Sequence, residues 1–225
     1  MVATLVKLAY KPIVRWAAYR ILKGRYLDRE QTNKGRFTRT DMNRILDKTW
    51  RNFDELAPKA HVEQLQTQGN RQNVLLGVLT HALYRALLEE GLEKNYATEL
   101  VSDLMWVVYE KWIVFPRATT RLSKRDPQKQ MDKMLRMFLR FPFSPPGYES
   151  EVLPEKGVLA LDIYRCPVHD YFKEQGELEF MLNSWCSQDF ALAQIMTEGG
   201  SYERPHTLAA GDKVCDMRWY GRPKP

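Results

Sequence analysis

Cys186 and Asp189 are the two residues whose types and spacing best suit covalent chemistry. Asn183 and Ser184 are typical helix N-cap residues, so the sequence predicts a helix that starts here and holds Cys186 in its first turn. Unpaired backbone N–H groups and the helix dipole favour a thiolate there, and we expect the thiol pKa to lie below its usual value of about 8.5. Asp189 follows on the same helical face, where a carboxylate can move protons for the nucleophile.

Other residues near this pair suit the binding of a small molecule. Arg204 or Arg165 is expected to hold a substrate carboxylate, because guanidinium groups bind carboxylates through paired hydrogen bonds. His206 is a candidate for assisting proton transfer. Trp185 is expected to form an apolar wall. Cys215 is expected to lie beside the substrate, where it either binds the substrate or supports the strand next to the site.

The cysteines also permit a metal site. Cys166 and His169 have C-x-x-H spacing, and with Cys186 and Cys215 they supply the four ligands of a Cys₃His zinc site. The ligands would have to converge from separate elements, because the sequence has no C-x-x-C pair. Buried cysteine is also commonly inert packing. The covalent, metal and packing interpretations therefore stay open, and the covalent one needs no cofactor.

The first 140 residues have the hydrophobic spacing of helices. This spacing predicts helices over 5–22, 40–56, 73–90, 97–115 and 128–139. Pro12 is expected to kink the first of them, and the fourth is expected to end before Pro116. Residues 28–40 are polar and basic, and they are predicted to form a loop.

A proline-rich break, Phe141-Pro-Phe-Ser-Pro-Pro-Gly147, precedes a smaller C-terminal unit. This unit is predicted to hold a strand over 157–164, short helices near 167–174 and 184–196, and a hairpin of 202–208 with 213–220. Because the long helices and the strands occupy separate parts of the chain, the sequence predicts an α+β fold, with an N-terminal helical half followed by a small antiparallel sheet and two short helices. We expect a helical segment over 1–140 and an α+β catalytic or ligand-binding unit over 148–225. The alternative is that both parts form one integrated domain.

Positive charge is concentrated at the N-terminus. Residues 1–51 hold 13 Lys and Arg against 4 Asp and Glu, a net of +9, whereas the whole chain carries +6. Because the excess belongs to one segment, we expect no nucleic-acid partner. Lys7, Lys11 and Arg15 form a basic stripe, typical of a helix packed on the core with a solvated edge or of one making weak membrane-surface contact. We expect no transmembrane span or export signal, and a cytoplasmic protein whose thiols stay reduced.

Three stretches of the C-terminal unit match a family pattern. They are Cys-Pro-Val-His-Asp-Tyr-Phe at 166–172, Trp-Cys-Ser-Gln-Asp at 185–189 and Thr-Leu-Ala-Ala-Gly-Asp-Lys-Val-Cys-Asp-Met-Arg at 207–218. They resemble the conserved end of the L-2-amino-thiazoline-4-carboxylate hydrolase family. The last stretch is also similar to vinyl-reductase-type ligand-binding domains. Trp-Cys-x-x-Asp alone is similar to organomercurial lyases, in which two cysteines grip mercury and an aspartate protonates the leaving carbon.

The main resemblance implies a hydrolase that opens a small cyclic amidine or a related C–N bond by adding water. We expect Cys186 to attack the C=N carbon and Asp189 to relay protons, with a small molecule as the partner. Two other functions stay open. The C-terminal unit would also serve a ligand-binding or sensor domain without turnover, and the organomercurial-lyase likeness implies cleavage of a carbon–mercury bond by Cys186, Asp189 and Cys215.

Overall fold

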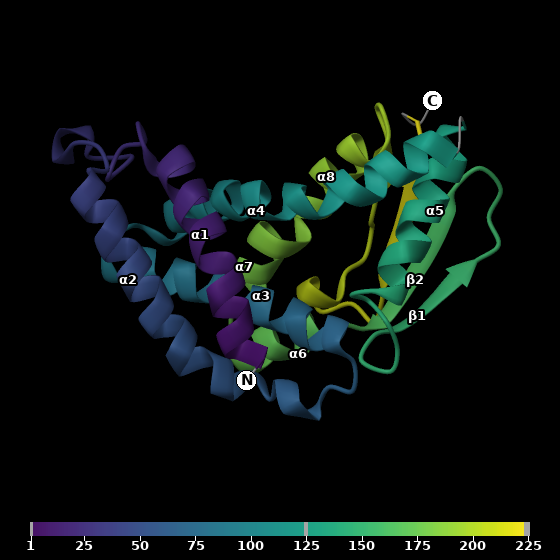
Figure 1. The fold of residues 1–225 in the computed structure, drawn as a ribbon, viewed down its shortest axis with the longest axis horizontal. Coiled ribbons are helices and arrows are strands. Elements are labelled where there is room, and N and C mark those ends of the chain that lie inside the picture. Colours follow the sequence, from purple (N-terminus) through teal and green to yellow (C-terminus); the bar gives the residue numbers. More distant parts are fainter. Residues whose placement is uncertain (1, 124–125, 223–225) are drawn as a thin grey trace.

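The computed structural model describes residues 2–123 and 126–222, and it has a helical part and a sheet (Figure 1). The helices are α1 (Val2–Leu22), α2 (Arg39–Leu56), α3 (Gln68–Glu89), α4 (Lys94–Ser123), α5 (Pro127–Arg140), α6 (Pro167–Glu174), α7 (Leu178–Met181) and α8 (Gln188–Met196). A π-helical turn, η4 (Leu182–Cys186), joins α7 to α8. Short 3₁₀ turns are η1 (Thr32–Lys34), η2 (Ala57–Ala60), η3 (Val62–Gln64) and η5 (Leu208–Ala210). The strands are β1 (Glu149–Leu153), β2 (Leu159–Arg165), β3 (Ser201–Glu203) and β4 (Cys215–Tyr220).

Helix α3 is the centre of the helical part and is apolar nearly all round, as expected of a helix enclosed by others. Leu75, Leu79 and Leu83 are fully buried, and α1, α2, α4 and α6 all contact the helix. Gly77 lets α6 approach, because a Cβ at this position would lie 3.0 Å from a methyl group of Val168. Helix α2, which packs most extensively on α3, starts at a capping box in which Thr38 and Asp41 satisfy each other's backbone N–H groups.

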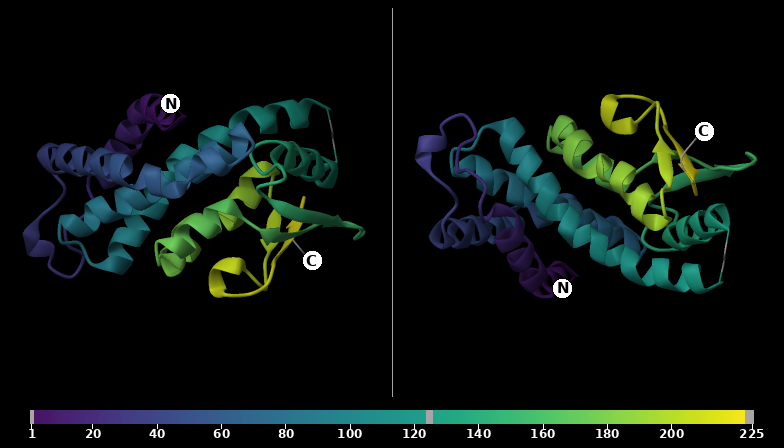
Figure 2. Two further views of the ribbon diagram at one scale, coloured as in Figure 1. Left: turned by 90° about the horizontal axis from the view of Figure 1, so that it is seen from below. Right: turned by 90° about the horizontal axis from the view of Figure 1, so that it is seen from above.

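The four strands form one antiparallel sheet in the order β1-β2-β4-β3. Leu161 pairs with Met217 and Ile163 with Cys215, so these side chains share one face of the sheet. Helices α5 and α8 pack near that face, and their apolar residues join it in a second hydrophobic core. Figure 2 shows α6, α7 and α8 in a row beside the long helices, leading to the sheet. This row connects the two cores.

The α+β prediction is confirmed, with the sheet following the N-terminal helices. Helix α4 is longer than predicted and continues through Pro116 to Ser123. Proline removes only one backbone donor, and packing of α4 against α1, α5 and α8 stabilises the helix on both sides of it. Strand β1 was not predicted. In the predicted hairpin, 204–208 is not a strand, and of the first arm only β3 (Ser201–Glu203) pairs with β4.

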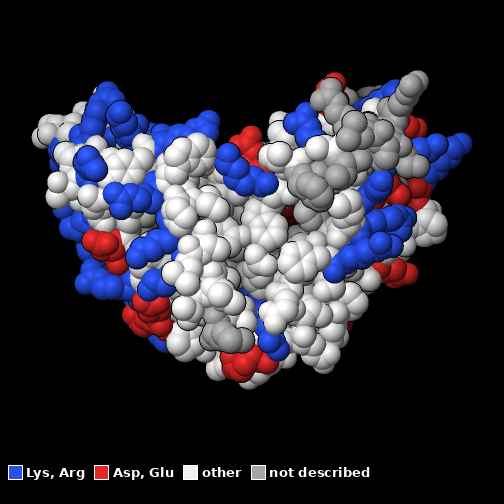
Figure 3. Space-filling model, in the orientation of Figure 1, with Lys and Arg blue, Asp and Glu red and all other residues white. Residues whose placement is uncertain are grey.

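The N-terminal basic segment is helical where predicted, and one side of it is buried. Val6, Tyr10 and Val14 of α1 lie in the core, while Leu5 and Leu8 are exposed. Figure 3 shows Lys and Arg gathered at the left over the N-terminal segments and at the right edge, with uncharged residues between them. Within 2–123 and 126–222, the structure has no helix that is both long enough and apolar enough to cross a membrane.

Candidate functional site

Cys186 lies in the π-helical turn η4, in the middle of a helical run that extends from α7 into α8. The predicted helix start at Asn183 and Ser184 is therefore wrong, and Cys186 has no free first turn beside it. Single π turns inside helices are rare and occur frequently at functional sites. They insert an extra residue per turn, and this changes the direction in which the following side chains point.

Local side chains replace the backbone hydrogen bonds that the π turn disturbs. The Ser184 hydroxyl donates to Phe180 O at 2.7 Å, and Gln188 Nε2 donates to Ser184 O at 3.0 Å. Gln188 Nε2 also donates to Ser102 Oγ of α4 at 2.7 Å, which ties the turn to the helical part. A serine hydroxyl bonded to the carbonyl four residues back commonly bends a helix. The serine and glutamine thus hold Cys186 and Asp189 in place.

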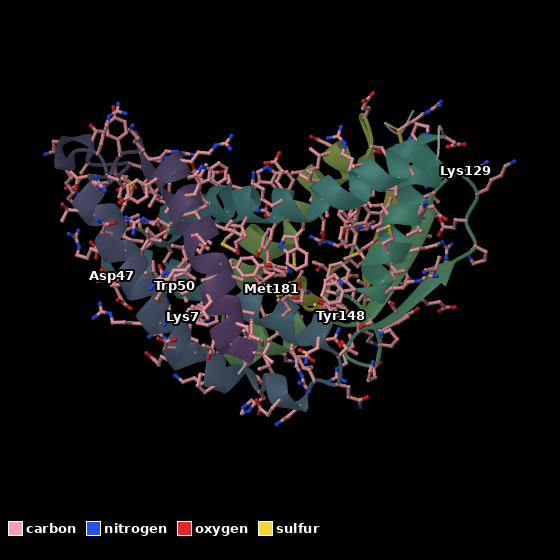
Figure 4. All side chains as sticks on the ribbon, viewed as in Figure 1. Lys7, Asp47, Trp50, Lys129, Tyr148 and Met181 are labelled. Atoms are coloured by element: carbon pink, nitrogen blue, oxygen red, sulfur yellow. The ribbon has the colours of Figure 1, made fainter. Side chains whose placement is uncertain are left out.

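A cavity of about 90 Å³ lies between α5, η4, α8, η5 and the inner face of the sheet. Its polar or reactive lining residues are Tyr148, Cys166, His169, Trp185, Cys186, Asp189, Arg204, Thr207, Cys215 and Trp219. The remaining wall is mostly leucine, phenylalanine and methionine. In Figure 4, Tyr148 and Met181, which both line the cavity, lie in the middle of the molecule between the helices and the sheet. An enclosed, mainly apolar cavity with a few converging polar groups is typical of a small-molecule site.

Burial raises the pKa of the Cys186 thiol well above its ordinary value. The Arg204 guanidinium opposes this shift, while the Asp189 charge adds to it. The expected low pKa is therefore wrong, because it depended on a helix N-terminus that the structure does not have. At neutral pH the thiol is protonated, and it needs a proton acceptor before it can act as a nucleophile.

Asp189 is the carboxylate that shares this cavity with Cys186. Burial raises the pKa of its carboxyl to about 6, although Arg204 and a hydrogen bond from Tyr202 partly offset the shift. Arg204 Nη1 donates to Asp189 Oδ2 at 3.0 Å, and the Tyr202 hydroxyl lies 3.5 Å from the same oxygen. The side chain of Asp189 is 26% exposed, and the residue lines the cavity. A carboxyl that titrates near pH 6 can both accept and donate protons at neutral pH.

Two cavity-lining N–H donors have no partner. Within the described residues, the buried side-chain N and O atoms without a hydrogen bond are Arg204 Nε, Trp219 Nε1 and Asn70 Oδ1. The Arg204 side chain is 5% exposed and Trp219 is 3% exposed, and both line the cavity. An unsatisfied buried donor costs about 1–3 kcal/mol, so these two N–H groups favour a ligand that carries hydrogen-bond acceptors.

Strand alternation explains which sheet residues reach the cavity. Cys215, Met217 and Trp219 of β4 line it, whereas Asp216 lies on the opposite face. The predicted proton-transfer residue His206 is bonded to this Asp216, with its Nδ1 2.8 Å from Oδ2, and its side chain is 59% exposed. The structure therefore does not bring His206 to Cys186 or Asp189.

The other predicted site residues divide between the cavity and the surface. Trp185, Cys215 and Arg204 line the cavity with Cys186 and Asp189. Arg165 does not, because its side chain is 50% exposed and pairs with Asp170 at 3.2 Å and with Glu149 at 3.9 Å. Of the two arginines proposed to bind a carboxylate, only Arg204 faces the cavity.

Cys166 and His169 of the zinc alternative also line the cavity. Burial raises the pKa of Cys166 to about 12, and His169 Nδ1 lies 3.4 Å from an oxygen of Asp170. Across 2–123 and 126–222, no three His, Cys, Asp or Glu side chains are grouped so that they could hold a metal ion. The geometry thus places the predicted ligands in one cavity without forming the Cys₃His site.

Two tyrosines of the site were not identified from the sequence. Tyr148, at the edge of β1, is buried in the cavity wall, and Asn73 of α3 donates to its hydroxyl at 2.5 Å. Tyr202 of β3 contacts Asp189. Only the alternation around Tyr202 offered a signal, since the residue was predicted to lie in a strand. Tyr148 follows the proline-rich break, and nothing in its neighbours indicates an inward direction.

A comparison with protein families identifies the chain. Residues 71–219 match the model of the L-2-amino-thiazoline-4-carboxylic acid hydrolase family, which is more than half of the sequence. The chain belongs to this family. The matched segment starts in α3 and ends in β4, so it includes every polar or reactive residue of the cavity wall. Neither the curated proteins nor the solved structures contain a match to the chain.

Proposed function

We propose that this protein is a hydrolase that opens a small cyclic amidine of the 2-amino-thiazoline-4-carboxylate type at a C–N bond. The observation that carries the proposal is that one cavity combines the Cys186 thiol, a carboxyl whose pKa is about 6 and a buried arginine with an unpartnered N–H group. The family name describes a hydrolase of this substrate type. The cavity supplies the nucleophile, the proton carrier and the anion-binding group that such a reaction needs.

The substrate carboxylate is oriented by the two unpartnered donors. Arg204 Nε and Trp219 Nε1 each have an N–H group without an acceptor, and a carboxylate satisfies both. The Arg204 Nη1 group stays bonded to Asp189, so one guanidinium links the bound anion to the proton carrier. Binding the anion thus relieves two unsatisfied donors, and it places the rest of the substrate toward Cys186.

The first half of the reaction forms a bond between Cys186 and the substrate. Ionised Asp189 takes the thiol proton while sulfur attacks the amidine carbon, and the C=N π electrons move to the nitrogen. Asp189 then gives this proton to the ring nitrogen. The ring C–N bond breaks as the amino nitrogen forms a C=N bond to the same carbon, and Asp189 carries a proton from that nitrogen to the ring nitrogen, which departs as an amine. The high pKa of the resting thiol is compatible with this step, because proton transfer and attack occur together.

The second half releases the product and restores the thiol. Water adds to the carbon that carries the Cys186 sulfur and gives a proton to Asp189, while the C=N π electrons move to the nitrogen. The new hydroxyl then gives its proton to this nitrogen and forms a C=O bond as the bond to the Cys186 sulfur breaks, and this sulfur takes the proton back from Asp189. The net change is the consumption of one water and the cleavage of one C–N bond. Asp189 ends in its starting state.

Turnover of 2-amino-thiazoline-4-carboxylate by purified protein, followed by chromatography, tests this proposal. Asp189→Asn keeps the shape but removes the proton acceptor, so turnover should fall by roughly two to four orders of magnitude. Cys186→Ser should be at least as damaging, and the double variant should lose little more than the worse single one, because both residues act as one unit. Full activity in Asp189→Asn would end the proposed mechanism. If the wild type binds 2-amino-thiazoline-4-carboxylate but does not turn it over, a ligand-binding domain is favoured instead.

Cleavage of a carbon–mercury bond is the second candidate. The observation that favours it is that the Cys215 and Cys186 thiols line the same cavity as Asp189. In that reaction the two thiolates hold mercury, the C–Hg bond breaks, and Asp189 gives the carbon a proton that it took from a thiol. Incubation with an alkylmercury salt distinguishes the candidates. Cys215→Ser should abolish this reaction as fully as Cys186→Ser, whereas amidine opening should tolerate Cys215→Ser better.

A further inference from the structure

A second cavity, of about 110 Å³, adjoins the first on the side of the helical part. We call it the aromatic chamber. Its lining residues are Asn73, Leu76, Trp106, Tyr109, Trp112, Ile113, Phe138, Pro142, Phe143, Trp185, Gln188, Asp189 and Leu192. They come from α3, α4, α5, η4 and α8 and from the loop after α5. Six of these thirteen side chains are aromatic, so the chamber mainly offers flat, apolar surfaces to a ligand.

The aromatic chamber and the reactive cavity share part of their walls. Trp185 and Asp189 line both spaces, as do Leu192, Phe138 and Phe143. A hydrogen bond of 2.5 Å also joins Asn73, which lines the chamber, to Tyr148, which lines the reactive cavity. The chamber therefore lies directly beside the space that Cys186 lines, with Asp189 at the boundary between them.

The walls of the chamber are held rigidly. Trp112 is stacked between Tyr10 of α1 and Phe141, with ring centroids 6.4 and 6.5 Å apart and planes tilted by 10° and 12°. Trp185 meets the Tyr109 ring edge-on at 5.1 Å. The Tyr109 hydroxyl is itself fixed by Thr80 Oγ1 at 2.9 Å. Side chains clamped in this way do not collapse to fill the space, so the chamber is preformed for an occupant.

We infer that the aromatic chamber is a subsite for a flat, apolar substituent of the substrate. The substrate class is then a small cyclic amidine, or a related C–N compound, that carries an aryl or similarly flat group beyond the reacting carbon. The identity of the reacting group rests on the proposed function, whereas the apolar group is inferred from the chamber alone. The chamber selects among substrates, and Cys186 and Asp189 act on the part that they share.

Equilibrium dialysis with three probes tests this inference without requiring turnover. The probes are 2-amino-2-thiazoline, its 2-benzylamino derivative and 4-nitrobenzyl alcohol, which has a flat ring but no amidine. The benzylamino compound should bind the wild type at least about tenfold more tightly than its parent, because its ring moves from water into an apolar space. The nitrobenzyl alcohol should bind as well. Equal binding of parent and derivative, or no binding of the nitrobenzyl alcohol, would overturn the inference.

A chamber-filling variant and a matched control locate the binding. Leu76→Trp puts an indole into the chamber and should remove the advantage of the benzylamino compound while leaving the affinity for the parent unchanged. Leu8→Trp makes the same change on the exposed side of α1 and should alter neither affinity. If Leu76→Trp does not fold, the wild-type comparison of the three probes still decides the matter. Binding of the nitrobenzyl alcohol without binding of either thiazoline supports the chamber and counts against the amidine chemistry.

Discussion

Most buried polar groups around α3 have hydrogen-bond partners, whereas two buried donors in the cavity beside the sheet have none. Around α3, His81 Nδ1 is bonded to the Tyr171 hydroxyl at 2.9 Å, and Thr80 donates to the carbonyl of Leu76 at 2.8 Å. In the cavity, Arg204 Nε and Trp219 Nε1 are buried without partners. Asn70 Oδ1, at the first turn of α3, is the remaining buried atom of this kind among the described residues.

The pKa shifts of buried titratable groups also distinguish the core around α3 from the cavity. Burial lowers the pKa of His81 to about 4, so the ring is neutral at physiological pH and satisfied as a neutral group. Burial raises the pKa of Asp189 to about 6, close to the pH at which a proton carrier works best. The first region is arranged for stability. The second retains unsatisfied and perturbed groups that a bound molecule would satisfy, which is typical of a functional site.

Truncating one leucine side chain in each region tests this comparison. Leu83→Ala, in the fully buried core, should cost about 2–5 kcal/mol in the free energy of unfolding, because it leaves a cavity among packed helices. Leu192→Ala should cost less, since Leu192 already borders two open spaces. Denaturant unfolding of both variants measures the difference. Turnover per folded molecule should be unchanged in Leu83→Ala, and equal destabilisation by the two changes would contradict the comparison.

The pH dependence of kcat/KM sharpens the assignment of Asp189. In the proposed mechanism the carboxyl must be ionised to accept the thiol proton, and its pKa in the folded protein is about 6. Activity should therefore be level above pH 6 and fall about tenfold for each pH unit below it. Residual activity in Asp189→Asn should lack this dependence. An acidic limb that persists in Asp189→Asn would assign the titration to another group.

Stability provides an independent readout of the same group. The raised pKa of Asp189 stabilises the fold below the unfolded value of 3.8, and this contribution is lost as pH rises through 6. The lowered pKa of His81 acts in the opposite direction, with stability lost as pH falls from 6.5 through 4. The two effects oppose each other in the wild type. The free energy of unfolding of the wild type minus that of Asp189→Asn should thus decrease by up to about 3 kcal/mol between pH 4 and 6.

The sequence was sufficient to predict most of the helices and the α+β class. The apolar spacing of α3 and the residues of β4 are local patterns, and they correctly indicated a helix and a strand. The motif residues Cys186, Asp189 and Cys215 do line one cavity. These predictions depended on short-range regularities, which a single sequence contains.

The errors came from features that tertiary packing decides. The π turn at Cys186 is followed by Gln188, which donates a hydrogen bond to Ser102 of α4, a contact 86 residues away in sequence. The continuation of α4 through Pro116 depends on helices packed on either side of it. His206 and Arg204 are two residues apart, and only the chain path after β3 decides that one reaches the cavity and the other does not. Neither composition nor spacing contains this information.

Replacing His206 should have the smallest effect, and it tests how far the site extends. His206 is two residues from Arg204 in sequence, but its side chain is largely solvated and bonded to Asp216, which lies on the sheet face opposite Cys215. His206→Gln should change the free energy of unfolding by no more than about 0.5 kcal/mol, in the range of an exposed ion pair, and leave kcat/KM within twofold of wild type. Arg204→Gln is the contrasting variant, because it removes the guanidinium that contacts Asp189 and should impair turnover strongly. A large loss of kcat in His206→Gln, with the melting temperature unchanged, would show that the ring reaches the substrate. It would extend the functional site across the sheet edge.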